Sequence, residues 1–346
     1  MANGISGGVA IILGAGSSHD CADRRTAAQV NDHYLPPLAR DIFSQNFDEI
    51  LGRYPTITAR LDELRTKLGE GGNFEKIFRS LLESAEGHQN YWPLQLPLFL
   101  RELFWTISLE YLRGSSKFDT LVRGVLESHL DRVMFFNLNY DLFLEDALRN
   151  YDHHEFNSLA SYTPESKKWL YVKPHGSVNW SRILKNCPVD GMGTLLPSRL
   201  QEMPVFSSEL RVVMWNRHSR GFYIPGGGPP GYLYPQLVVP TDRPKNFVCP
   251  EDQMNQARTF IQNCRRFLMI GFSGHDEDVV DLLQNVPSQS HLAIVSKGDA
   301  RTIFYRISSR VPSLQSKEVV SSFHDDGFSK FVGSKTFEQF VAGESA

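Results

Sequence analysis

The sequence predicts an α/β fold built on a parallel β-sheet with helices on both faces. Short apolar runs that suit strands buried on both sides recur at residues 8–13, 133–136, 169–172, 267–270 and 292–295. Segments of helical periodicity lie between several of these runs, as a parallel sheet requires. These runs lead into glycine or polar residues, which is typical of the carboxyl edge where such sheets bind ligands.

The segment Val133-Met-Phe-Phe-Asn-Leu-Asn-Tyr-Asp141 is the centre of this prediction. It begins as an apolar strand and ends in the polar residues Asn137, Asn139 and Asp141, and a predicted helix over residues 142–149 follows at once. The polar side chains should therefore lie at a strand-to-helix turn on the ligand-binding edge. We predict that Asn139 and Asp141 belong to a catalytic site.

The first strand runs into Gly14-Ala-Gly-Ser-Ser18. Glycines let the backbone approach a pyrophosphate, and a following helix offers free N–H groups. Gly14, Ala15, Gly16 and Ser17 are therefore candidate cofactor-binding residues, although a plain tight turn explains the pattern too. The third glycine of a G-x-G-x-x-G motif is missing, because His19 stands in its place.

Between the first strand and the central strand, residues 38–130 show mostly helical periodicity interrupted by glycine-rich turns. We expect one domain over residues 1–346, with a helical insertion at 38–130 and an irregular lid or interface insertion at 181–235.

His175 follows another predicted strand in Trp169-Leu-Tyr-Val-Lys-Pro-His-Gly-Ser177. It stands 36 residues after Asn139, about the length of one βαβ unit. If the two strands are parallel, their polar ends share one edge of the sheet. A histidine exchanges protons near neutral pH, so His175 is a candidate general base. A histidine that only satisfies local hydrogen bonds is the alternative.

The strand predicted at 267–273 ends in Gly271 and Ser273, and Gly274-His-Asp-Glu-Asp-Val279 then opens a helix. These residues again follow a predicted strand, on the edge where open α/β sheets bind ligands. Acidic residues are also favourable in a first helical turn, because they meet the positive end of the helix dipole. Helix capping is therefore an equally good explanation for Asp276.

Composition narrows the possible classes of protein. No stretch approaches the ~20 apolar residues of a membrane span, and the N-terminus does not resemble a signal peptide, so we expect a cytoplasmic protein without a membrane partner. The net charge of -3 argues against direct nucleic-acid binding. Four scattered cysteines form no C-x-x-C pair, which argues against a zinc site or a disulfide framework.

Four segments together resemble the sirtuin superfamily. In chain order they are Gly14-Ala-Gly-Ser-Ser18, Asn137-Leu-Asn-Tyr-Asp141, Lys173-Pro-His-Gly-Ser-Val-Asn-Trp180 and Gly271-Phe-Ser-Gly-His-Asp276. Each motif is weak alone, but their order is specific and they span most of the chain. The closer likeness is to the prokaryotic sirtuin-like proteins of anti-phage defence, in the forms of the last three motifs.

Two departures separate the chain from protein-deacylating sirtuins. Those enzymes carry a four-cysteine zinc module after the histidine motif, whereas that region here holds only Cys187 and Cys249. The Pro-Asp-Phe-Arg segment of the deacylase cofactor loop is also absent after Gly16. The resemblance therefore implies a fold without a zinc module, no metal, and NAD⁺ as a substrate cleaved to nicotinamide and ADP-ribose. Such an NADase would deplete the infected cell of NAD⁺ in abortive infection.

The resemblance also suggests roles for the candidate residues. His175 would act as general base, Asn139 would hold the ribose or a water, and Asp141 would bind the carboxamide or steady the positive ring. Backbone groups at residues 14–17 would hold phosphate. Gly271, Ser273 and Asp276 would line the adenosine side.

A toxic NADase needs control, so we expect a homo-oligomer or a separate sensor protein. Relatives pair with a HerA-type ATPase, an Argonaute-like protein or a nucleotide-processing enzyme, and the sequence does not choose among them. Three alternatives stay open. The chain could be an NAD⁺ or ADP-ribose sensor without cleavage, a sirtuin-type protein deacylase, or a structural subunit of a nucleic-acid-targeting complex.

Overall fold

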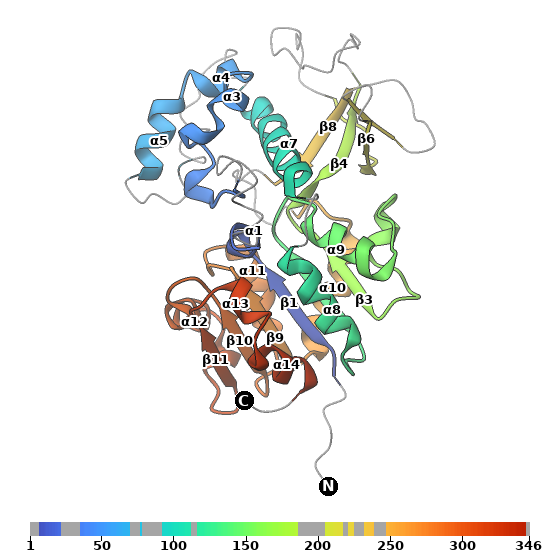
Figure 1. Ribbon diagram of the computed structural model, residues 1–346, viewed down its shortest axis with the longest axis vertical. Helices are drawn as coiled ribbons and strands as arrows, with labels where there is room; N and C mark the ends of the chain where they lie inside the picture. The colour runs from blue at the N-terminus through green and yellow to red at the C-terminus, as the bar shows by residue number, and fades with distance from the viewer. Residues whose placement is uncertain are drawn as a thin grey trace.

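The computed structural model has a body built on a parallel sheet and a second part made of helices and short antiparallel strands (Figure 1). The structure describes residues 7–21, 35–69, 77, 92–111, 116–185, 205–216, 221–224, 232–238 and 247–343. Among these residues, no helix combines the length and the apolar character needed to cross a bilayer.

Six strands form the main sheet, and every neighbouring pair is parallel. They are β1 (Val9–Leu13), β2 (Val133–Asn137), β3 (Trp169–Val172), β9 (Arg266–Ile270), β10 (His291–Val295) and β11 (Val320–His324). Their order is β11-β10-β9-β1-β2-β3, which is the doubly wound order of the Rossmann fold. The predicted α/β class and its parallel sheet are confirmed.

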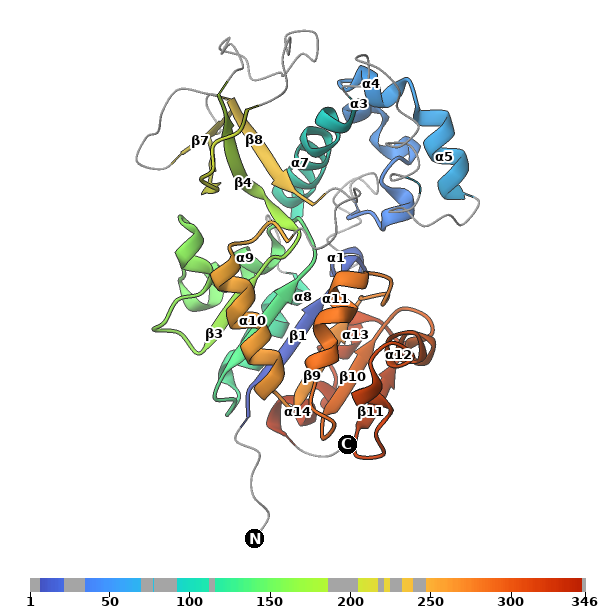
Figure 2. The same ribbon diagram turned by 180° about the vertical axis from the view of Figure 1, so that it is seen from behind.

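Helices cover both faces of this sheet. Figure 1 shows α8 (Lys117–Glu127), α9 (Phe143–Asp152), α13 (Phe328–Phe331) and α14 (Lys335–Ala342) on one face. Figure 2 shows α10 (Glu251–Asn263) and α11 (Glu277–Leu282) on the other, and α12 (Ala300–Ser308) lies near the β11 edge. With helices on both sides, β1 is completely enclosed, and none of its residues is more than 1% exposed.

The helical insertion is shorter than predicted from the sequence. Among the described residues its α-helices include α3 (Asp48–Leu51), α4 (Pro55–Thr58), α5 (Leu61–Gly69) and α7 (Trp92–Tyr111), and these lie apart from the main sheet (Figure 1). The predicted span of 38–130 also contains α8, but α8 belongs to the body. Its buried Phe118 packs against Phe143 of α9 and Phe328 of α13. Periodicity did not distinguish these helices, because both kinds present an apolar face.

The segment predicted to be irregular at 181–235 contains regular strands where the structure describes it. A small antiparallel sheet has the order β5-β4-β8, with β4 (Gly176–Leu184), β5 (Arg211–Val212) and β8 (Tyr232–Leu237). β6 (Met214–Asn216) pairs with β7 (Gly221–Tyr223). Arg101 of α7 donates a hydrogen bond of 2.8 Å to the Leu233 carbonyl of β8 and so joins the helical insertion to this sheet. The glycine-rich stretch 226–231 lies outside the described residues.

The last strand of the main sheet, β11, was not expected from the sequence. It reads Val-Ser-Ser-Phe-His and none of its residues is fully buried, because it forms one edge of the sheet. An edge strand needs fewer apolar residues than a central strand, so no continuous apolar run marked it.

Candidate active site

The polar strand ends predicted from the sequence meet at the carboxyl edge of the main sheet. β1 is the first strand in the chain, yet β2 and β3 lie on one side of it and β9, β10 and β11 on the other. The order therefore reverses between β1 and β9. In open α/β sheets this reversal opens the position where ligands bind.

The turns that follow β1 and β9 are in direct contact. The N–H of Gly14 donates to the Ile270 carbonyl at 2.9 Å, and the N–H of Gly16 donates to the Gly271 carbonyl at 3.1 Å. A Cβ on Gly16 would lie 2.8 Å from the Gly271 Cα. A Cβ on Gly271, whose φ is +62°, would lie 2.1 Å from the Ser17 nitrogen. The glycines are therefore required by this contact between backbones.

That contact changes the interpretation of the first motif. The sequence suggested that N–H groups at residues 14–17 hold a phosphate, but those of Gly14, Gly16 and Ser17 already bond to carbonyl oxygens of the protein. Ala15 is the exposed residue of this turn. Phosphate binding by all of these N–H groups at once is not compatible with the hydrogen bonds observed.

Asn139 lies under the same turn and is 6% exposed. Its amide nitrogen donates to the Gly14 carbonyl at 3.1 Å, to Ser17 Oγ at 3.1 Å and to Ser18 Oγ at 2.9 Å. Its backbone N–H donates to Asn137 Oδ1 at 3.0 Å. These bonds fix the side chain against the β1 turn, and they engage its nitrogen rather than its oxygen.

Asp141 is buried, with 1% exposure, and its carboxylate contacts protein groups. Ser18 Oγ donates to Asp141 Oδ2 at 2.6 Å, and the Phe143 N–H donates to Oδ1 at 3.3 Å. Burial raises the pKa of the Asp141 carboxyl, against the opposing effects of Lys173 and of the Ser18 hydrogen bond. This environment favours a role in holding the loop over direct contact with a ligand.

His175 and Asp276 form an ion pair, with 2.9 Å between Nε2 and Oδ2. The two side chains are 20% and 16% exposed, so both reach the surface of the edge. β3 and β9 are three strands apart, or about 14 Å at the usual strand spacing. The turn after β3 therefore reaches over the ends of β2 and β1 to bring His175 to Asp276.

Asp276 has a second role as the N-cap of α11, where its Oδ1 accepts a hydrogen bond from the Val279 N–H at 3.0 Å. Although burial raises the pKa of the Asp276 carboxyl, the hydrogen bond and charge of His175 outweigh it, and the net pKa is lowered. The capping explanation is confirmed, and the structure adds a partner that the sequence did not suggest. Ser273, by contrast, is exposed, and Arg306 hydrogen-bonds to its carbonyl.

Sequence reasoning missed Lys173, although it lies within the quoted histidine motif. Its side chain is 0% exposed, and its Nζ lies 2.8 Å from Glu145 Oε1, itself buried on α9. The one available signal was a lysine placed between the apolar Val172 and Pro174. Its partner Glu145 could not be identified, because nothing in the helical pattern separates a buried glutamate from an exposed one.

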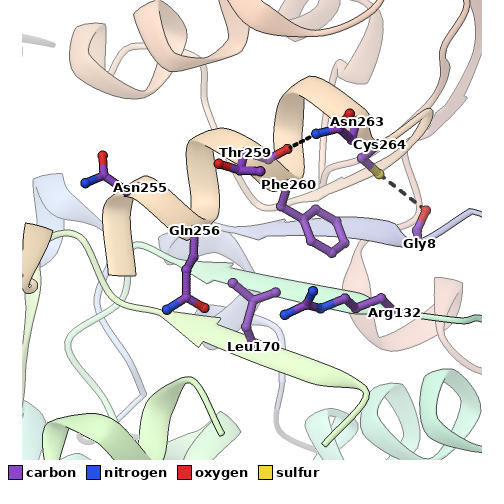
Figure 3. A pocket seen from close by; sticks show the side chains of 9 residues that line it. All are labelled: Gly8, Arg132, Leu170, Asn255, Gln256, Thr259, Phe260, Asn263 and Cys264. Carbon is purple, nitrogen blue, oxygen red and sulfur yellow. Dashed lines mark hydrogen bonds between the residues drawn. The ribbon is translucent and has the colours of Figure 1, made fainter. Parts of the chain in front are cut away.

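A surface groove lies elsewhere on the main body. A groove of about 460 Å³ is found at the amino edge of the sheet, between α10 and the beginnings of β1, β2 and β3 (Figure 3). Its lining residues are Gly8, Arg132, Leu170, Asn255, Gln256, Thr259, Phe260, Asn263 and Cys264. None of the predicted site residues lines it, so it is separate from the candidate active site.

Comparison with known proteins gives matches in structure alone. No protein-family model matches the chain, and no curated protein matches its sequence. Sir2Tm bound to a propionylated peptide aligns over 96% of this chain and 93% of its own, at 12% identity and a TM-score of 0.38. A Sir2 homologue in complex with 2′-O-acetyl ADP-ribose aligns over 97% and 91%, at 10% identity and a TM-score of 0.42. A Sir2 homologue–NAD complex aligns over 97% and 88%, at 11% identity and a TM-score of 0.41. At these values no residue role is transferred to this chain.

Proposed function

We propose that this chain is an NAD⁺ glycohydrolase that cleaves NAD⁺ to nicotinamide and ADP-ribose. The observation that carries the proposal is the convergence of all four motifs at one edge of the sheet. Asn139 of the second motif contacts the first, and His175 of the third pairs with Asp276 of the fourth. The four motifs are far apart in the sequence, and the structure brings them together at this edge.

The proposed reaction is attack of water on the anomeric carbon of the nicotinamide ribose. The bond from that carbon to the ring nitrogen breaks, nicotinamide leaves as a neutral molecule, and the water loses one proton. His175 would accept that proton, directly or through a ribose hydroxyl, a role typically worth about 10²–10⁴-fold in rate. Asp276 fixes the orientation of the imidazole and stabilises its protonated form.

Asn139 would contribute through its amide oxygen. Its nitrogen is held by three acceptors, and within the described part of the chain no hydrogen bond to the oxygen is observed. An uncharged acceptor suits a water or a ribose hydroxyl, because it orients the O–H without adding charge near the positive ring. Asp141 would act indirectly by holding Ser18, and thereby the turn against which Asn139 rests.

We further propose that cleavage drains NAD⁺ in anti-phage defence and that a partner protein or self-assembly controls it. This part of the proposal is supported by the likeness of the last three motifs to defence-type sirtuin-like sequences. The helical insertion and the small antiparallel sheet lie outside the catalytic body, so they are the candidate surfaces for such control (Figure 1).

The test is NAD⁺ content in cells that express the chain with its genomic neighbours during phage challenge. Wild type should drain NAD⁺ and release nicotinamide, whereas His175→Ala and Asn139→Ala should not. His291→Ala is the matched control, since it removes a histidine at the amino end of β10, and it should behave as wild type. If NAD⁺ stays constant in cells with the wild-type chain, and calorimetry shows that the purified chain binds NAD⁺, the proposal of an enzyme is refuted in favour of an NAD⁺ sensor.

A further inference from the structure

Lys173 places a positive charge in the interior directly beneath the candidate active site. Its side chain is completely buried, and its Nζ donates three hydrogen bonds. The acceptors are the Asp141 carbonyl at 2.6 Å, Glu145 Oε1 at 2.8 Å and Ser177 Oγ at 2.8 Å. They belong to the loop after β2, to α9 and to β4, so one ammonium group connects three elements.

Lys173 bonds to both of the loops that carry the candidate catalytic residues. Asp141 ends the loop that carries Asn139, and Ser177 stands two residues after His175. A backbone hydrogen bond of 3.0 Å from the Val178 N–H to the Tyr140 carbonyl joins the same two loops. The loop that carries His175 and the loop that carries Asn139 are therefore joined by this backbone bond and by the Lys173 ammonium group.

Glu145 extends this network to the asparagine itself. Its Oε2 accepts a hydrogen bond from the Tyr171 hydroxyl at 2.8 Å, and that hydroxyl accepts one from Asn137 Nδ2 at 2.9 Å. Asn137 Oδ1 then accepts the backbone N–H of Asn139 at 3.0 Å. A continuous chain of buried polar groups thus runs from Lys173 to the backbone of Asn139.

We propose that Lys173 is a positioning residue, which with Glu145 fixes the spacing between the loops that carry His175 and Asn139. The expected effect on the rate of NAD⁺ cleavage rests on the proposed function, whereas the expected effect on the two loops does not. Stability alone does not explain the pair, because an apolar pair of similar volume is often as stable as a buried ion pair or more so. An apolar pair would fill the space without holding the Asp141 carbonyl or the Ser177 hydroxyl.

The test is the double variant Lys173→Met/Glu145→Gln in the full chain. It removes both charges together, so neither is left buried and unpaired, and the glutamine amide keeps an acceptor for Tyr171. Lys168→Met is the matched control, because Lys168 lies just before β3 at the opposite edge, where its Nζ bonds to the Ser128 carbonyl. Activity is measured as kcat and KM for nicotinamide release, with the genomic neighbours present.

For the double variant we expect kcat to fall about 100-fold with little change in KM, since misplacing reacting groups by about 1 Å has that effect. Independently of activity, hydrogen exchange read by mass spectrometry should become faster in peptides covering 137–142 and 173–180. Exchange in β1 should stay as in wild type, and Lys168→Met should change none of these quantities.

Different results refute the two proposals. A double variant that folds with wild-type kcat and wild-type exchange in both peptides overturns the positioning role. Faster exchange throughout β1 and β2, with an unchanged kcat for the folded fraction, also overturns it and assigns the pair to general stability. A wild type that never cleaves NAD⁺ refutes the proposed function, while the exchange data still decide whether Lys173 fixes the two loops.

Discussion

Replacing Asp276 with asparagine isolates the contact between Asp276 and His175. The carboxylate has two partners, the Val279 N–H at 3.0 Å and His175 Nε2 at 2.9 Å. Asparagine is as good an N-cap as aspartate, so α11 keeps its cap in the variant. What is lost is the negative charge facing the imidazole.

The structure sets the size of the expected effect on stability. The Asp276 side chain is 16% exposed, so solvent screens the pair only partly. A hydrogen bond to a charged group contributes about 1.5–3 kcal/mol, and we expect Asp276→Asn to lower the free energy of unfolding by about that amount near neutral pH. The rate of NAD⁺ cleavage should fall by about 10-fold or more, because an imidazole that is not held in orientation loses part of the ~10²–10⁴-fold rate enhancement typical of general base catalysis.

The pH dependence has a definite sign. His175 lowers the pKa of the folded Asp276 carboxyl below its ordinary value of 3.8. Near that pH the unfolded chain therefore binds more protons than the folded one, and wild-type stability falls as the pH falls. The difference between wild type and Asp276→Asn should be fully present at about pH 6 and should shrink below about pH 3.8, as the wild-type carboxyl becomes protonated.

The assay is urea unfolding of both proteins across this range, with nicotinamide release measured near neutral pH. Asp299→Asn is the control, because Asp299 caps α12 through the Thr302 N–H, and the substitution there changes an N-cap aspartate in the same way. A variant at 276 that matches wild type in both stability and rate would refute the assignment of Asp276 to His175. So would a stability difference that grows as the pH falls.

Three further predictions concern the packing around the site. Gly271→Ala should lower the free energy of unfolding by about 3 kcal/mol or more in a denaturation assay, because the residue has φ +62° and its new Cβ would lie 2.1 Å from the Ser17 nitrogen. Glu145→Leu should cost about 3–5 kcal/mol in the same assay, since it leaves the Lys173 ammonium buried without its counter-charge, and adding Lys173→Met should restore most of the loss. Cys264 should resist iodoacetamide in the native protein and react after unfolding, as read by peptide mass spectrometry, because burial raises its pKa to about 11.

The sequence predicts the body of the fold well, because strands that are buried in a parallel sheet consist of continuous apolar runs. β1 and β2 are two such runs, and the structure pairs them in parallel, with Val9 opposite Val133. Edge and surface elements carry weaker signals. β11 is polar and half-exposed. β4 begins within the histidine motif, at Gly176, and belongs to a small antiparallel sheet that no apolar run predicted.

For the candidate site, the sequence predicts which segments meet but not which atoms do. Strand ends at one edge were expected to converge, and Asn139, His175 and Asp276 do lie along that edge. The pairing of His175 with Asp276 depends on the turn after β3, which crosses the ends of two other strands. The path of such a turn cannot be predicted from the periodicity of the sequence. The first glycine motif was interpreted as a phosphate site, because a sequence cannot show that Gly16 and Gly271 must both be glycine for their two turns to pack together.

The distribution of charge around the edge follows one physical requirement. In the proposed reaction the nicotinamide ring is positively charged while it is bonded to the ribose and leaves as a neutral molecule, so a positive charge beside the bound ring would oppose binding. Lys173 places a positive charge within the histidine motif, yet its Nζ is enclosed by Asp141, Glu145 and Ser177 and points into the protein. The side chains of His175 and Asp276 both reach the surface of this edge, and the Asp276 carboxyl, whose pKa is lowered, is negative at neutral pH. The charge of Lys173 is thus neutralised below the loops, which lets the edge present a base and a negative charge to the cationic nicotinamide ring of the proposed substrate.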